Sequence, residues 1–187
     1  MTARAGEPDP ARSDPLLHVV LIEPEIHTNT GNIGRLCVAA GAALHLVEPL
    51  GFEIDDRRLK RAGLDYWPHL DWRRHASLAA FQARLGELGG GVWYATGRGR
   101  LAYTDAVYRP GDVLVFGKES VGLPQALLDA NPERTIRIPI RAQARSLNLA
   151  HAVGIVVFEA LRQFQARGLA PFEVAGGPPV ARPRDLD

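Results

Sequence analysis

Short apolar runs alternate along the chain with segments whose apolar residues recur every three or four positions. Helical spacing puts Ile33, Leu36, Cys37 and Ala40 on one face of a helix that ends near Gly41. The apolar runs predict strands at 16–22, 43–47, 92–95, 113–116 and 135–140. Between them, helices are predicted over 77–88, where three glycines stop the pattern, and from Pro124 onward. This alternation predicts an α/β fold with a mainly parallel sheet flanked by helices.

The last predicted helix has the widest apolar surface. Its helically spaced apolar residues are Leu149, Val153, Val156, Val157, Ala160, Leu161 and Phe164. Ile155 and Phe158 widen this stripe, so the helix needs partners on more than one side. In a small domain, a second subunit could supply one of those sides.

The composition indicates one domain, at residues 16–167. The 187 residues are enough for a single domain with a core. Residues 1–15 carry both charge signs without an apolar stretch, so we expect a disordered N-terminal arm rather than a signal peptide. Residues 168–187 are rich in Pro and Gly, and we expect a loose tail. No apolar run reaches the roughly 20 residues of a membrane span.

Charge and cysteine content narrow the class of protein only a little. The net charge of +1 neither requires nor excludes a nucleic-acid partner. Cys37 is the single cysteine, which rules out an intrachain disulfide and favours a cytoplasmic protein. The six histidines lack the spacing of metal ligands, so no metal is expected.

A basic stretch with aromatic residues lies in the middle of the chain. Its members are Arg57, Arg58, Lys60, Arg61, Tyr66, Trp67, Arg73 and Arg74. Such a run is usually a solvated face, but interleaved aromatic residues without balancing acidic ones are also typical of an RNA-binding surface. The sequence leaves both interpretations open.

Three polar segments that contain glycine or helix-capping residues lie where a strand or loop should meet a helix. They are 29–35 (NTGNIGR), 116–124 (FGKESVGLP) and 138–153 (IPIRAQARSLNLAHAV). Ligands of open α/β sheets bind at the carboxyl ends of strands, close to helix N-termini. The three segments therefore predict a ligand site.

In the first segment, Arg35 is expected in the first turn of its helix, off the apolar stripe. A cation there opposes the helix dipole, which makes sense if an anion such as phosphate binds beside it. The alternative is a surface arginine without a role. Asn29 and Thr30 are good N-cap residues, and for Asn29 capping is the simpler interpretation.

In the second segment, Gly117 and Lys118 look like the end of a P-loop, but Glu119 stands where Ser or Thr is needed and Asp112 where the first glycine is needed. ATP binding is therefore not expected. Gly117 and Gly122 suit a loop bent tightly around a ligand. Glu119 could cap a backbone amide or accept hydrogen bonds from a substrate.

In the third segment, Ser146 and Asn148 are both candidate caps of the long helix. Arg141 and Arg145 add positive charge beside the same junction. A lone histidine such as His151 is more often structural than catalytic.

Together these segments resemble the SPOUT superfamily of RNA methyltransferases, in the branch that methylates ribose 2′-hydroxyls. The resemblance covers about residues 17–165 and rests on the phrases PEIHTNTGNIGRLC, EPLGF, KRAGLDYW, FGKESVGLP and RIPI followed by RSLNLAHAV. These phrases are similar to those of the short bacterial enzymes that modify the tRNA wobble nucleotide.

The resemblance implies a C-terminal trefoil knot, which is rare among proteins. It also implies a homodimer and bound S-adenosyl-L-methionine, with Ala95, Gly117, Ile138 and Ser146 lining the cofactor pocket. The implied substrate is the anticodon stem-loop of tRNA, methylated at a wobble cytidine or modified uridine. Two alternatives are methylation of another tRNA or rRNA ribose and a non-catalytic RNA-binding knot dimer.

By the same resemblance, Arg35 is the principal catalytic residue, surrounded by Asn29, Glu119, Ser146 and Asn148. Arginine side chains are poor bases because their pKa exceeds about 12. We therefore expect Arg35 to grip a phosphate and orient the ribose hydroxyl, with direct deprotonation as the alternative. Related wobble enzymes can have a tyrosine where this chain has Phe158, so no hydroxyl is expected there.

Overall fold

The computed structural model describes residues 14–53 and 66–169. The first four members of the basic stretch, at positions 57, 58, 60 and 61, lie outside the described residues. Most of the predicted arm at 1–15 and of the predicted tail at 168–187 also lies outside them.

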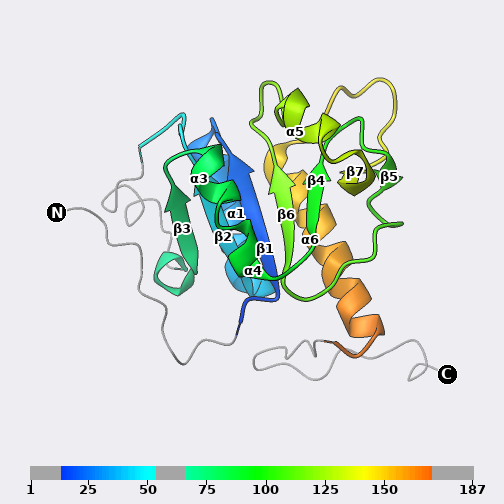
Figure 1. Cartoon of the computed structure of the whole chain (residues 1–187), viewed down its shortest axis with the longest axis horizontal. Coiled ribbons are helices and arrows are strands. Elements are labelled where there is room, and N and C mark those ends of the chain that lie inside the picture. The colour runs from blue at the N-terminus through cyan, green and yellow to red at the C-terminus, as the bar shows by residue number, and fades with distance from the viewer. Residues whose placement is uncertain (1–13, 54–65, 170–187) are drawn as a thin grey trace.

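A seven-stranded sheet forms the centre of the fold, in the order β3-β2-β1-β6-β4-β7-β5 (Figure 1). The strands are β1 (Leu17–Ile22), β2 (Ala42–Val47), β3 (Trp72–His75), β4 (Val92–Ala95), β5 (Leu101–Ala102), β6 (Asp112–Phe116) and β7 (Thr135–Arg137). Every pairing between them is parallel, which confirms the predicted sheet. All carboxyl ends therefore meet at one edge of the sheet.

Helices cover both faces of the sheet. They are α1 (His27–Ala40), α3 (Leu78–Gln82), α4 (Leu85–Leu88), α5 (Gln125–Asp129) and α6 (Leu149–Ala166), with single 3-10 turns η1 (Trp67–His69) and η2 (Pro132–Arg134). The α1 and α6 helices pack on one face, over a core that includes Leu17 and Leu21 of β1. The shorter helices pack on the other face, where Phe81 and Leu127 belong to the same apolar cluster as Val20. Figure 1 looks onto the face that carries α3 and α4.

Three details differ from the sequence-based expectation. The helix predicted over 77–88 is two short helices, and Ser77 Oγ caps the first by accepting a hydrogen bond from the Ala80 amide at 3.1 Å. The strand predicted over 135–140 ends at Arg137. The short strands β3 and β5 were not predicted: β3 has the sequence WRRH, whose charged residues hide a strand at the edge of the sheet.

A row of three buried histidines crosses β1, β2 and β3. His18 Nδ1 lies 3.1 Å from His45 Nε2, and His45 Nδ1 lies 3.0 Å from His75 Nε2. Phe81 of α3 packs edge-on against His45 and His75. Burial lowers the pKa of all three imidazoles, that of His45 to about 2. Each neutral imidazole has one donor and one acceptor, so an uncharged row can satisfy both internal hydrogen bonds.

Candidate active site

The position of Asn29 shows that it is not a helix cap. The N-cap of α1 is Ile26, whose side chain cannot accept a hydrogen bond, and Asn29 lies inside the first turn. The capping role predicted for Asn29 is therefore wrong, and so is that for Thr30. The Asn29 side chain is buried and points to segments far away in the sequence.

Three of the predicted site residues are joined by hydrogen bonds. Asn29 Nδ2 donates to Glu119 Oε1 at 2.9 Å, across 90 positions of sequence. Asn148 Nδ2 donates to Asn29 Oδ1, also at 2.9 Å, across 119 positions. The start of α1, the loop after β6 and the start of α6 therefore meet at one point, which we call the Asn29 junction (Asn29, Glu119 and Asn148).

The carboxylate of Glu119 sets the direction of these bonds. An ionised carboxylate only accepts, so Asn29 must present its amide nitrogen to Glu119 and its oxygen to Asn148. The Asn148 nitrogen is then the donor, and its oxygen is left to cap α6. That oxygen accepts from the backbone amides of Ala150 at 2.9 Å and His151 at 3.3 Å. Asn148 is the predicted cap that forms, whereas Ser146 is exposed, two residues earlier.

Glu25 and Ser120 add a second connection between the same two segments. The backbone amide of Glu25 donates to Glu119 Oε2 at 2.8 Å. In return, the Ser120 amide and hydroxyl both donate to the Glu25 carboxylate at 2.8 Å, which lowers the pKa of Glu25. Neither residue is predicted from the sequence, because nothing local marks a contact between positions 95 residues apart.

The loop after β6 is bent as tightly as its glycines predicted. A Cβ at Gly117 would lie 2.1 Å from the carbonyl carbon of Gly122 and 2.2 Å from the Leu123 amide nitrogen. Gly122 has a φ of +77°, a conformation that favours glycine, and Lys118 pairs with it in an antiparallel bridge. Binding of a ligand by this loop remains a prediction.

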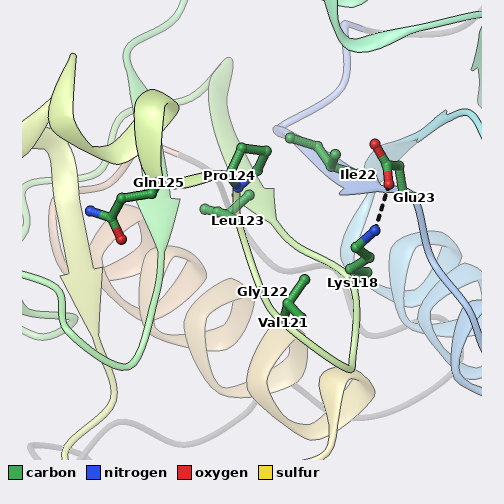
Figure 2. Close-up of a pocket in the computed structure, with 8 residues that line it drawn as sticks. All are labelled: Ile22, Glu23, Lys118, Val121, Gly122, Leu123, Pro124 and Gln125. Atoms are coloured by element: carbon green, nitrogen blue, oxygen red, sulfur yellow. Dashed lines mark hydrogen bonds and ion pairs between the residues drawn. The ribbon is translucent and has the colours of Figure 1, made fainter.

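A cavity of about 360 Å³ lies beside this loop (Figure 2). Its lining residues are Ile22, Glu23, Lys118, Val121, Gly122, Leu123, Pro124 and Gln125. Lys118 Nζ donates to Glu23 Oε2 at 2.8 Å, which ties the ends of β1 and β6 together. None of the four predicted cofactor residues is among the described residues that line this cavity.

Three of the predicted cofactor residues come together at the carboxyl edge of the sheet. Ala95 ends β4, Gly117 follows β6 directly, and Ile138 follows β7 directly. These strands are neighbours, and Ala95 is in register with Phe116 on one side and Ile136 on the other. Ser146, the fourth predicted residue, lies in the exposed segment that leads from β7 to α6.

Arg35 lies in the third turn of α1, not in the first turn as predicted. The argument from an unfavourable charge at the helix N-terminus therefore does not apply. Arg35 is exposed, and its Cζ atom lies 5.0 Å from the ring centroid of Tyr66. It is six residues beyond Asn29, about 9 Å along the helix axis. The structure thus joins Asn29, Glu119 and Asn148 directly, and places Arg35 farther along the same helix.

The described members of the basic stretch do not form an open aromatic platform. Tyr66 is 8% exposed, and Trp67 packs against Trp72 with ring centroids 5.5 Å apart. Arg74 is exposed and paired with Glu48.

The described residues offer neither a metal site nor a membrane-spanning helix. Among them, no group of His, Cys, Asp or Glu side chains is arranged to hold a metal ion. In the same part of the chain, no helix combines the length and apolar character needed to cross a bilayer.

Comparison with known proteins places this geometry in a family. The model of the SpoU rRNA Methylase family matches residues 16–158. A tRNA (cytidine(34)-2'-O)-methyltransferase from Burkholderia pseudomallei is 48% identical over 149 residues, 79% of this chain and 96% of the relative. A solved structure that describes the 2-OH methylation of C/U34 on tRNA is 48% identical, with a TM-score of 0.76, and covers 83% of this chain and 100% of its own. An AdoMet-bound rRNA methyltransferase from Sinorhizobium meliloti is 31% identical, with a TM-score of 0.67, over 81% of this chain and 57% of its own. The chain belongs to the SpoU rRNA methylase family.

Proposed function

We propose that this protein transfers a methyl group from S-adenosyl-L-methionine to the ribose 2′-hydroxyl of the tRNA wobble nucleotide, a cytidine or modified uridine at position 34. The Asn29 junction is the observation that carries the proposal, since it gathers three distant segments at the carboxyl edge of the sheet. Relatives at 48% identity that act on this nucleotide support the choice of substrate. We assign the activity to the domain at residues 16–167.

We assign the cofactor to the carboxyl ends of β4, β6 and β7. Ala95 and Ile138 are half-buried apolar residues at that edge, and Gly117 allows the tight turn that follows β6. Ser146 lies in the segment that would close over the same edge. When bound, S-adenosyl-L-methionine supplies an electrophilic methyl group on a sulfonium centre. The AdoMet-bound relative from Sinorhizobium meliloti supports this assignment.

We assign to Arg35 the positioning of the substrate. Its guanidinium is exposed and carries a planar set of donors that matches two oxygens of a phosphate. Gripping the phosphate next to the target ribose would hold the 2′-hydroxyl in line for attack, and positioning of this kind supplies a large part of many rate enhancements.

We propose that the Asn29 junction fixes the position of Arg35 relative to the loops that bind the cofactor. Arg35 lies on the helix whose first turn contains Asn29, and Glu119 belongs to the loop that starts at Gly117. Asn148 ends the segment that contains Ser146, because its side chain caps α6. A shift of any of these segments would move Arg35, and the phosphate that it binds, relative to the methyl donor.

We further propose that the C-terminal part is knotted, that the enzyme is a homodimer and that it works in the cytoplasm. In support of the knot, β7 lies between β4 and β5, although it follows both in sequence. Mechanical unfolding that extends the chain to its full contour length would contradict it.

In support of the dimer, Phe158 on α6 is 50% exposed beside an otherwise buried stripe. A charged Phe158→Glu variant should then elute as a monomer.

Methylation of defined transcripts tests the function. Purified protein should transfer label from S-adenosyl-L-methionine to tRNA with cytidine 34, and mass spectrometry should place the methyl group on that ribose. A matched tRNA with 2′-deoxycytidine 34 should remain unlabelled. Label elsewhere in tRNA or in rRNA would keep the chemistry and refute the target. A folded protein that binds no cofactor would refute the function altogether.

The Arg35→Lys variant tests the phosphate grip separately. Lysine keeps the positive charge but loses the planar pair of donors, so we expect a large loss of kcat/KM for tRNA with unchanged cofactor affinity. Near-full activity of this variant would contradict the role assigned to Arg35.

A further inference from the structure

Two glycines of α1, Gly31 and Gly34, form a flat surface against which Tyr66 and Trp67 pack. A Cβ at Gly34 would lie 3.2 Å from both Trp67 and Leu70, and 3.5 Å from Tyr66. A Cβ at Gly31, one turn earlier, would lie 3.8 Å from the Tyr66 hydroxyl. The helix surface is therefore bare of side chains where Tyr66 and Trp67 rest on it.

The Tyr66 hydroxyl binds Tyr66 to this surface of α1. The hydroxyl donates to the carbonyl oxygen of Gly31 at 2.5 Å, and the side chain is nearly buried. In an α-helix, the carbonyl of residue 31 is also the acceptor for the backbone amide of residue 35. Tyr66 thus contacts α1 at the hydrogen bond that holds the Arg35 backbone in place.

The ring of Tyr66 also contacts the Arg35 side chain. The distance of 5.0 Å from the Arg35 Cζ atom to the ring centroid is within the roughly 6 Å range of a cation–π interaction. An exposed arginine otherwise samples many rotamers, and ordering it carries a cost in side-chain entropy. A guanidinium whose carbon lies over an aromatic ring can still present N–H groups at its edge to an anion.

We propose that Tyr66 is a positioning residue for Arg35: it selects the guanidinium orientation that receives the substrate phosphate. The proposal rests on the proposed function, which gives Arg35 its role. Direct stacking of an RNA base on Tyr66 is disfavoured by the geometry, because the residue is 8% exposed and Arg35 covers its ring.

Four variants test this: Tyr66→Leu, Tyr66→Phe, Arg35→Lys and the double variant Tyr66→Leu/Arg35→Lys. Tyr66→Leu should lower kcat/KM for tRNA about fivefold, because the stacking surface is lost. Tyr66→Phe keeps the ring and should restore activity to within about twofold of the wild-type value. In the Arg35→Lys background, Tyr66→Leu should have almost no further effect, because no guanidinium remains for Tyr66 to orient. Cofactor affinity, measured by calorimetry, should be unchanged throughout.

Tyr108→Phe is the matched control for loss of a buried hydroxyl. The Tyr108 hydroxyl also donates to a backbone carbonyl, that of Tyr103 at 2.7 Å, but it lies far along the chain from Arg35. This variant should lower the melting temperature without lowering kcat/KM. If Tyr66→Leu fails to fold, Tyr66→Met replaces it, since the longer and more flexible methionine side chain fills more of the space left by the ring without an aromatic face.

Two outcomes overturn the inference and leave the proposed function intact. One is full activity of Tyr66→Leu when Arg35→Lys is impaired. The other is an equal loss from Tyr66→Leu in both backgrounds, which would show that Tyr66 does not act through Arg35. Full activity of Arg35→Lys would instead remove the role of Arg35, and with it the premise of the inference.

Discussion

Acidification should destabilise this protein through its buried histidine row. The pKa of His45 falls from 6.5 to about 2 on folding, because burial and its two histidine neighbours disfavour the charged form. Below pH 6.5 the unfolded chain therefore binds a proton that the folded chain does not. The free energy of unfolding must fall as the pH drops from 6.5 toward 2, and this loss is absent above neutrality.

The size of the effect follows from the difference in pKa. Each pH unit below the unfolded-state value costs about 1.4 kcal/mol for a histidine that stays neutral when folded, so His45 alone should cost about 2 kcal/mol at pH 5. His18 and His75 shift in the same direction and add to the loss. The nearby arginines, Arg73 and Arg84, also lower the pKa of His45, whereas Asp71 and Asp14 raise that of His18.

Hydrogen bonding alone would tolerate a charge on His45. A protonated His45 could donate to both neighbours, each of which can present an acceptor nitrogen. Desolvation therefore decides the outcome: His45 is 1% exposed and has Phe81 against its ring.

Urea unfolding at pH values of about 7.5, 6.0 and 5.0 would measure this, with His45→Gln as the matched variant. Glutamine keeps a donor and an acceptor but does not titrate. Over this range, the wild-type protein should lose about 2 kcal/mol more than the variant. Equal losses in the two proteins would refute the reasoning, because they would show that His45 takes up no proton on unfolding.

Three further substitutions have defined outcomes. Gly117→Ala should lower cofactor affinity at least tenfold by calorimetry, because its Cβ would overlap the backbone at Gly122, whereas Gly86→Ala, with nothing within 4 Å, should leave affinity unchanged. Asn148→Ala should lower the free energy of unfolding in urea by about 1–2 kcal/mol, since α6 loses its cap; no change would mean that water replaces the cap. Asp112→Asn should lower the free energy of unfolding by about 1–3 kcal/mol, because the Asp112 carboxylate accepts hydrogen bonds from the amides of residues 91 and 109 and from the Trp93 indole. An unchanged melting curve would contradict this.

Much of the fold was predictable because local patterns encode it. Buried parallel strands such as β1 and β6 are largely continuous apolar runs, and Gly41 and Gly89 end helices in the left-handed conformation expected of glycine. The edge strand β3 was missed because its arginines break that pattern. The start of α1 was misplaced because Ile26 is not a capping residue, and this error put Arg35 in the wrong turn.

By itself, the sequence determined the α/β class, the order of its main elements and the residue types that mark the family. Only the tertiary structure decided that Asn29 bonds Glu119 and Asn148 rather than capping a helix, and that Tyr66 lies under Arg35. The physical reason is range: periodicity and capping act over a few residues, whereas these contacts join positions that only the packing of distant segments brings within hydrogen-bond distance.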